Sequence, residues 1–313
     1  MISTERVEGH ATSSAMIGQV HWAPVRSLWT GSLFALGLIG AAFTVSLENV
    51  LIFLGLTAVT IGLGHSIGMH RLLIHRSFSC PLWLEYSLVW LGVLVGMAGP
   101  IGMIRIHDLR DWAQRQAECH DFFAHRRGFW QDAAWQLHGK LILRHPPRFR
   151  LESRVADDPV YRWMERTWML QQIPVALILW LLAGWDAVIW GVALRVTVSL
   201  TGHWLIGHFA HRDGHQTWRV EGAAAQGFDL PWAALITFGE SWHGNHHAYP
   251  DSARLSQRPG EIDPGWWVIK ALERVGLVRD IITPDALPFR PGLLRVDPDD
   301  RHHCPCLSLF SHD

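Results

Sequence analysis

The stretch SLWTGSLFALGLIGAAFTVSL (residues 27–47), followed after Glu48-Asn49 by VLIFLGLTAVTIGLGHSIG (residues 50–68), decides the fold of this chain. Neither run contains Asp, Glu, Lys or Arg. Each run is long enough to cross a bilayer core of ~30 Å as a helix. The two residues between the runs leave room only for a tight turn, so the pair predicts a helical hairpin in a membrane.

A second pair of apolar runs covers residues 169–185 and 187–207, with Asp186 between them. Each run is about one span in length, although Arg195 interrupts the second. Helices are the usual spanning element because they satisfy their own backbone hydrogen bonds in lipid. We therefore predict an all-α membrane protein with four transmembrane helices in two hairpins and a cytoplasmic helical cap.

A histidine cluster, HGNHH (residues 243–247), follows later in the chain. Neutral imidazole is the commonest protein ligand for iron, zinc and copper. His243, His246 and His247 are spaced i, i+3, i+4 and would lie along one stripe of a helix. We therefore expect their nitrogens to converge on one small volume and to bind a metal.

An earlier cluster, HRLLIH, begins at His70 and ends at His75, just past an apolar run. These two residues are roughly 140° apart around an ideal α-helix. They can share a site only if the helix ends between them or if they approach it from different sides. His203, His208 and His211 close the last apolar run, and at least one of them is expected to complete a metal shell. For His203 and His208, a structural role at the helix end is an alternative.

The composition supports a membrane protein and excludes some other classes. Only 18% of the 313 residues are charged, below the roughly 25% of soluble domains. The 18 tryptophans often flank the apolar runs, where amphipathic rings favour the headgroup zone. A net charge of −1 gives no sign of a nucleic-acid partner.

The arginines predict the orientation. The expected turns at residues 48–49 and 184–186 contain no Lys or Arg. The arginines lie at the opposite ends of the spans, at Arg26, Arg71, Arg76 and between Arg105 and Arg166. By the positive-inside rule those ends are cytoplasmic. We therefore predict a multi-pass membrane protein with both termini and all histidine clusters on the cytoplasmic side.

Residues 82–104 are also mostly apolar and long enough to span. A crossing there would put His107 on the opposite side from His70 and would exclude a common site. Glu85, several glycines and Pro100 favour instead an interfacial helix or one that dips in and returns.

These features divide the chain into an N-terminal leader (1–26), a membrane domain (27–280) and a C-terminal tail (281–313). The first apolar run lies behind a polar leader, which does not match a cleavable signal. Residues 266–280 are expected to form a short amphipathic helix. The HHCPC run at 302–306 has metal-binding residue types, but a chance cluster in a disordered tail is the favoured interpretation.

The chain resembles the membrane-bound fatty acid desaturases of the acyl-CoA desaturase type. The family's first box, HxxxxH, matches residues 70–75, and its third box, HxxHH, matches residues 243–247 after a GES run similar to the family's GEG. Residues 126–129 (RRGF) resemble the motif that follows the second box, and His211 falls where the family has an extra metal-ligand histidine. The resemblance extends from about residue 27 to 275.

The second box departs from the family's HxxHH pattern, because the corresponding stretch is HDLRD (107–111). The first histidine is kept, whereas the adjacent pair has become Arg110 and Asp111. Asp111 is a candidate ligand, since carboxylates suit iron. Arg110 cannot ligate and would bring positive charge towards the site unless it turns away or pairs with Asp108 or Asp111.

The resemblance implies a set of metal ligands at the matching positions: His70, His75, His107, His211, His243, His246 and His247. Other side chains are expected as alternative ligands or as supports for the ligands: His120, His125, His208 and Asn245. No catalytic side chain is expected beyond the metal centre.

The resemblance also implies two irons, an acyl-chain tunnel and an O2-dependent reaction that removes two hydrogens and gives an alkene and water. The acyl substrate is linked to CoA, a carrier protein or a lipid. The sequence has no haem-binding domain, GxGxxG fold or iron–sulfur cysteine cluster, so we expect a separate ferredoxin- or cytochrome b5-like electron donor.

The altered second box leaves two alternatives open. Fewer nitrogens and a carboxylate would shift the metal potential, which favours a lipid hydroxylase or oxygenase on the same scaffold. A membrane homologue that has lost its iron and its catalysis is the other alternative.

Overall fold

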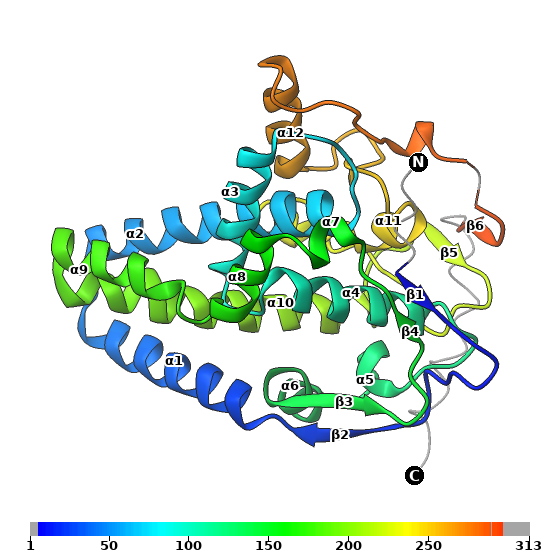
Figure 1. Ribbon diagram of the computed structural model, residues 1–313, viewed down its shortest axis with the longest axis horizontal. Coiled ribbons are helices and arrows are strands. Elements are labelled where there is room, and N and C mark those ends of the chain that lie inside the picture. The colour runs from blue at the N-terminus through cyan, green and yellow to red at the C-terminus, as the bar shows by residue number, and fades with distance from the viewer. Residues whose placement is uncertain (1–5, 289, 297–313) are drawn as a thin grey trace, which may run out of the picture.

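The computed structural model of the protein describes residues 6–288 and 290–296. Long helices run side by side through one half of the molecule, and short helices and two-stranded sheets form a cap on the other half (Figure 1). The cysteine- and histidine-containing run at 302–306 lies outside the described residues.

Three helical stretches in the described part of the chain are long and apolar enough to cross a membrane. Their elements are α1 (Pro24–Phe43), α2 (Leu47–Thr57) with the π-helical η1 (Ala58–Ile74), and α9 (Gln172–Val188) with the π-helical η2 (Ile189–Leu194) and α10 (Arg195–Ala210).

The third stretch reverses direction at Gly184. This residue has φ 81° and ψ −171°, a backbone conformation that glycine adopts far more readily than other residues. Arg195 Nη2 donates a hydrogen bond to Gln172 Oε1 at 2.6 Å across 23 residues, which would span about 35 Å in a straight helix. The α9 and α10 segments therefore fold back against each other, near the turn expected at Asp186.

Arg195 is a buried cation among apolar helices, with 0% of its surface exposed. Besides Gln172, it donates to the carbonyl oxygens of Gly191 at 2.7 Å and Leu94 at 2.6 Å. A charge in lipid-embedded sequence is costly unless polar groups surround it. Arg195 therefore connects its own hairpin to the Leu94 turn through oxygen acceptors.

The apolar segment 82–104 is broken into two helices. Helix α3 (Leu82–Val93) has 12 residues, fewer than the ~20 that a span needs, and α4 (Pro100–Gln114) begins at a proline. Glu85 in α3 is buried and forms ion pairs with Arg76 and Arg154, each at 2.7 Å. The path through α3 and α4 brings His107 back beside His75.

Glycines allow α3 to pack closely against η1. A methyl group on Gly64 would lie 2.3 Å from the carbonyl carbon of Leu91, and one on Gly68 would lie 2.4 Å from the carbonyl oxygen of Leu88. Backbone atoms cannot move aside as a flexible side chain can, so this contact depends on the missing side chains.

We expect Gly64→Ala to destabilise the protein by about 1–3 kcal/mol, because overpacking forces the two helices apart. Thermal unfolding in detergent measures the effect. Gly55→Ala is the matched control, since a methyl group there meets nothing within 4 Å and alanine favours a helix. Equal unfolding temperatures for the two variants would contradict the prediction.

The cap consists of short elements. Its helices are α5 (Asp121–Ala124), α6 (Phe129–His138), α7 (Ser153–Ala156), α8 (Pro159–Thr167), η3 (Pro231–Ala233), α11 (His243–Ala248), α12 (Pro264–Arg274) and η4 (Pro284–Ala286). Its antiparallel strand pairs are β1 (Val7–Glu8) with β4 (Arg148–Phe149), β2 (Gly18–Trp22) with β3 (Gly139–Leu143), and β5 (Trp218–Val220) with β6 (Leu293–Arg295).

These strand pairs correct the expectation of an all-α chain, although most of the protein is helical. Chain outside helices must still satisfy its backbone N–H and C=O groups, and short ladders do this in the cap. β1 and β2 belong to the expected leader (1–26), and β6 to the expected tail (281–313). The described parts of both segments therefore pack onto the cap.

The main apolar core lies where η1 meets α3, α4 and α8. Its buried residues include Met69, Leu73, Ile74, Val89, Val93, Ile104 and Met164. Met69, Leu73 and Ile74 are its members on η1, and Ile67 and Leu72 of the same helix belong to a second buried cluster. The segment that carries His70 is therefore held by packing on more than one side.

Candidate metal centre

Among the described residues, seven histidine side chains form two neighbouring groups, in each of which one potential ligand atom per residue lies within 4.8 Å of the others. We call the first, four-residue group the H4 group: His70, His75, His107 and His246. We call the second, three-residue group the H3 group: His211, His243 and His247.

His70 and His75 meet in the H4 group because η1 is π-helical. The His75 N–H donates to the His70 carbonyl oxygen at 3.0 Å, which is an i→i+5 bond. Such bonds place residues five apart on one face, as i→i+4 bonds do for residues four apart in an α-helix. The two ring centroids are 4.7 Å apart. The 140° separation expected from an ideal α-helix is therefore wrong here.

Helix α11 serves both groups. His243 Nε2 lies 3.0 Å from His211 Nε2 and 3.1 Å from His247 Nε2, whereas the His246 ring lies 4.6 Å from that of His70. The expectation that all three α11 histidines share one volume is therefore corrected. The i, i+4 pair belongs to the H3 group, and His246 points to the H4 group.

The ring nitrogens of the H4 group are placed as ligands of a metal ion would be. His246 Nδ1 is buried without a hydrogen-bond partner among the described residues, and His75 Nε2 lies 3.3 Å from His107 Nε2. Nitrogens that face one another in this way are suited to a shared cation, and imidazole suits iron as well as zinc or copper.

Burial keeps most of these imidazoles neutral, as ligation requires. It lowers the pKa of His247 to about 4. It also holds the pKa of four others well below the usual value: His75, His211, His243 and His246. His107 differs, because Asp111 and Asp108 outweigh burial and raise its pKa.

Glu240 contacts the Nδ1 atom of His70 and holds the orientation of its ring. Its Oε2 lies 2.5 Å from His70 Nδ1, and its Oε1 accepts hydrogen bonds from Ser66 Oγ at 2.6 Å and Arg71 Nε at 3.2 Å. Burial would raise the pKa of Glu240, but His70, Arg71 and Ser66 together hold it well below its usual range. A carboxylate on the second ring nitrogen fixes the orientation of a metal-binding histidine.

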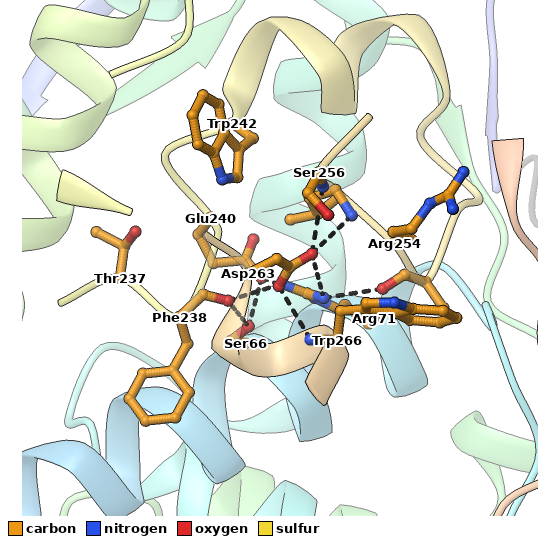
Figure 2. Close-up of polar contacts among 12 residues, drawn as sticks. Ser66, Arg71, Thr237, Phe238, Glu240, Trp242, Arg254, Ser256, Asp263 and Trp266 are labelled. Atoms are coloured by element: carbon orange, nitrogen blue, oxygen red, sulfur yellow. Dashed lines mark hydrogen bonds and ion pairs between the residues drawn. The ribbon is translucent and has the colours of Figure 1, made fainter. Parts of the chain in front are cut away.

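Arg71 connects this carboxylate to the start of α12 (Figure 2). It is 1% exposed and contacts Asp263 Oδ1 at 2.9 Å and Oδ2 at 3.3 Å. It also donates to the carbonyl oxygens of Phe238 at 2.7 Å and Ala253 at 2.8 Å. Glu240 and Asp263 were missed in the sequence, although Glu240 stands in the GES run before His243.

The N-terminal segment supports His107. Asp108 Oδ1 lies 3.2 Å from His107 Nδ1, and Asp108 Oδ2 accepts a hydrogen bond from Arg6 Nη1 at 2.9 Å. Arg6 Nη1 also donates to the Ile74 carbonyl oxygen at 3.1 Å. Nothing in the sequence indicates these contacts, because Arg6 and Asp108 are 102 residues apart.

His125 and His208 lie outside both groups and form, with Asp132, a third group whose potential ligand atoms also lie within 4.8 Å of one another. They meet at Asp132, whose Oδ2 contacts His125 Nδ1 at 2.9 Å and His208 Nδ1 at 2.8 Å. Trp204 Nε1 donates to the same oxygen at 2.8 Å. Hydrogen bonds within the protein thus account for this buried carboxylate, which sequence reasoning missed.

His120 and Asn245 also have structural partners. His120 Nδ1 accepts a hydrogen bond from the Phe122 N–H at 3.1 Å and so caps α5. Asn245 Nδ2 donates to the Leu255 carbonyl oxygen at 3.0 Å and to Glu261 at 3.1 Å. Neither residue is in the H4 or H3 group.

His203 packs against His65, a residue that sequence reasoning did not single out. Their ring centroids are 5.2 Å apart at nearly right angles. His65 lies within the second apolar stretch, five residues before His70 on η1.

Arg110 lies outside both histidine groups and points to His125, whose ring stacks on that of His211 at 5.6 Å between centroids. Its Nη1 contacts His125 Nε2, and its Nη2 donates to Gln136 Oε1 at 2.8 Å. Asp111 lies outside the H4 and H3 groups, and its Oδ2 accepts a hydrogen bond from Arg115 at 3.1 Å. Of the options expected for Arg110, pairing with Asp108 or Asp111 is not found among the described residues, and the guanidinium contacts His125 and Gln136 instead.

Comparison with known proteins identifies the family. The model of the fatty acid desaturase family matches residues 46–258. The sn-1 stearoyl-lipid 9-desaturase of Anabaena variabilis is 37% identical over 82% of this chain and 94% of its own length. The sn-2 palmitoyl-lipid 9-desaturase of Nostoc sp. (strain 36) is 33% identical over 85% and 91%, and an acyl-CoA 5-desaturase of Anemone leveillei is 30% identical over 85% and 82%. The chain therefore belongs to the fatty acid desaturase family.

Proposed function

We propose that this fatty acyl desaturase uses O2 and two histidine-bound irons to place a double bond at carbon 9 of a saturated chain esterified in a membrane lipid. The observation that carries the proposal is the pair of adjoining histidine groups, joined through α11. Seven ring nitrogens, four in one group and three in the other, suit two ions better than one.

The seven histidines of the H4 and H3 groups would hold the irons. When bound, the irons would supply the oxidising power that no side chain has, since the methylene hydrogens are unactivated. The acyl chain loses two hydrogens. Two further electrons, supplied by the electron donor, and two protons complete the reduction of O2 to two waters. Glu240 and Asp108 hold the rings of His70 and His107 in position.

The proposed topology has four membrane crossings in two hairpins. The chain reversal at Gly184 and the three long apolar stretches support it. The arginine distribution favours a cytoplasmic location for the termini and for both histidine groups. The acyl chain would then enter from the bilayer and the electron donor from the cytoplasm.

Two of the relatives are named as 9-desaturases of lipid-linked acyl chains, which favours a glycerolipid substrate over acyl-CoA. A separate ferredoxin- or cytochrome b5-like protein would deliver the electrons, because this sequence has no motif for a redox group of its own besides the histidines.

The test is expression of the chain in a host that lacks a 9-desaturase, with mass spectrometry of intact lipids after a short isotopic pulse. We expect a new double bond at carbon 9 that appears first in glycerolipids, in cells that also supply the electron donor. A label that appears first in acyl-CoA would contradict the lipid substrate. An added oxygen atom would indicate a hydroxylase, and fewer than one iron per purified chain would indicate an inactive homologue.

A further inference from the structure

The two histidine groups are unequal, with four residues in the H4 group and three in the H3 group. The difference coincides with the altered second box, where Arg110 and Asp111 replace an expected pair of histidines. Arg110 and Asp111 both lie on α4, so side chains of this helix are the candidates for completing the H3 group.

One face of α4 reaches both groups. His107, Asp111 and Gln114 are spaced i, i+4, i+7 and lie along one stripe of this regular helix. At one end, His107 Nε2 is 3.3 Å from His75 Nε2 in the H4 group. At the other end, Gln114 Nε2 is 3.0 Å from His211 Nε2 in the H3 group. Asp111 is the middle member of the stripe, so its place is between the two groups.

Arg110 does not compete for this place. Its guanidinium lies over the Phe122 ring at 5.8 Å and contacts His125 and Gln136. The guanidinium is thus held by Phe122, His125 and Gln136, and it stays near His211, on whose ring His125 stacks at 5.6 Å between centroids. It does not occupy the place of Asp111 on the stripe.

The charge of Asp111 acts on both groups. Its carboxylate raises the pKa of His107 and opposes the lowering of the pKa of His246 and His247. Burial would raise the pKa of Asp111, but His107 and Arg115 are among the charges that hold it well below its usual range. The side chain is 17% exposed and ionised.

We propose that Asp111 supplies an oxygen ligand between the H4 and H3 groups, completing the three-histidine group. The centre would then contain seven imidazoles and one carboxylate. This inference rests on the proposed two-iron function. Carboxylate oxygen suits iron, and a negatively charged ligand stabilises the oxidised metal more than a neutral imidazole does.

The competing explanation is that Asp111 only forms an ion pair with Arg115 one turn along α4, at 3.1 Å. Since Arg115 is 44% exposed, such a pair contributes little to stability. Arg115→Gln removes this partner and keeps the carboxylate, so it separates the two explanations.

The experiment measures iron per chain and the Mössbauer spectrum of the purified full-length protein loaded with ⁵⁷Fe(II). We expect Asp111→Asn to lose about half of the bound iron, because one ion loses a ligand. Arg115→Gln should keep the wild-type iron content and spectrum. Asp111→His should keep the iron with a changed spectrum, because nitrogen replaces oxygen.

The proposal is overturned if Asp111→Asn keeps both irons with an unchanged spectrum, or if Arg115→Gln loses iron to the same extent. If Asp111→Asn does not fold, Asp111→His decides, and a wild-type spectrum in that variant overturns the ligand role. A wild-type protein that forms no product or holds less than one iron overturns the proposed function itself. A wild-type desaturase with two irons that is insensitive to Asp111 overturns only this inference.

Discussion

Replacing His246 with alanine is expected to abolish acyl desaturation while leaving the amount of membrane-inserted protein unchanged. His246 belongs to the H4 group and stands on α11 between His243 and His247 of the H3 group. Its loss removes a proposed ligand from one ion. Even residues that only support a ligand change activity by 10–100-fold, so we expect a loss of at least about 100-fold.

Lipid analysis of expressing cells and iron content of the purified protein measure this effect. His120→Ala is the matched control, because His120 is also a cap histidine but only caps the four-residue helix α5. We expect it to retain most of the activity and all of the iron. Product formation by His246→Ala at the level of His120→Ala would reject the assignment of the H4 group.

Replacing Arg71 with methionine is expected to produce the largest loss of stability among single substitutions of charged residues. The change leaves Asp263 and Glu240 without their shared cation, in a site where Arg71 and Asp263 are each about 1% exposed. Breaking a buried ion pair by removing one partner costs about 3–5 kcal/mol. The unfolding temperature in detergent and the yield of folded protein both report the loss.

Arg127→Met is the control for the Arg71 experiment. Arg127 pairs with Asp121 at 2.9 Å, but 48% of its side chain is exposed, so the change should cost no more than ~1 kcal/mol. If both variants unfold at the same temperature, the buried network of Arg71 does not stabilise the protein as proposed.

Much of the fold could be predicted from the pattern of apolar and charged residues along the sequence. Long uncharged runs identify apolar helices because burying charge in lipid is costly. The interruption near Asp186 coincides with the reversal at Gly184. The strands were not predicted, because strands of two to five residues carry too little periodicity. In the β1–β4 and β2–β3 pairs, moreover, the partners lie more than a hundred residues apart in the sequence.

The residues of the site could be predicted better than their grouping. The histidine spacing in residues 70–75 and 243–247 identified the candidate ligands. Ideal α-helical geometry, however, predicted the wrong grouping of these side chains around the site. η1 is π-helical, which brings His70 and His75 together, and no residue pattern in HRLLIH signals this winding. The supports of the histidines, such as Glu240 and Asp108, depend on tertiary contacts that a single sequence does not encode locally.

The position of Arg6 sets an order for the assembly of this protein. Its partner Glu152 is synthesised 146 residues later, which at 5–20 residues per second means about 7–30 seconds on the ribosome. Arg6 therefore takes its final place only after both α1–α2 and the α3–α4 segment have been made. Any restraint on Arg6 during biosynthesis would act through Asp108 on His107, which is about a hundred residues away in the sequence.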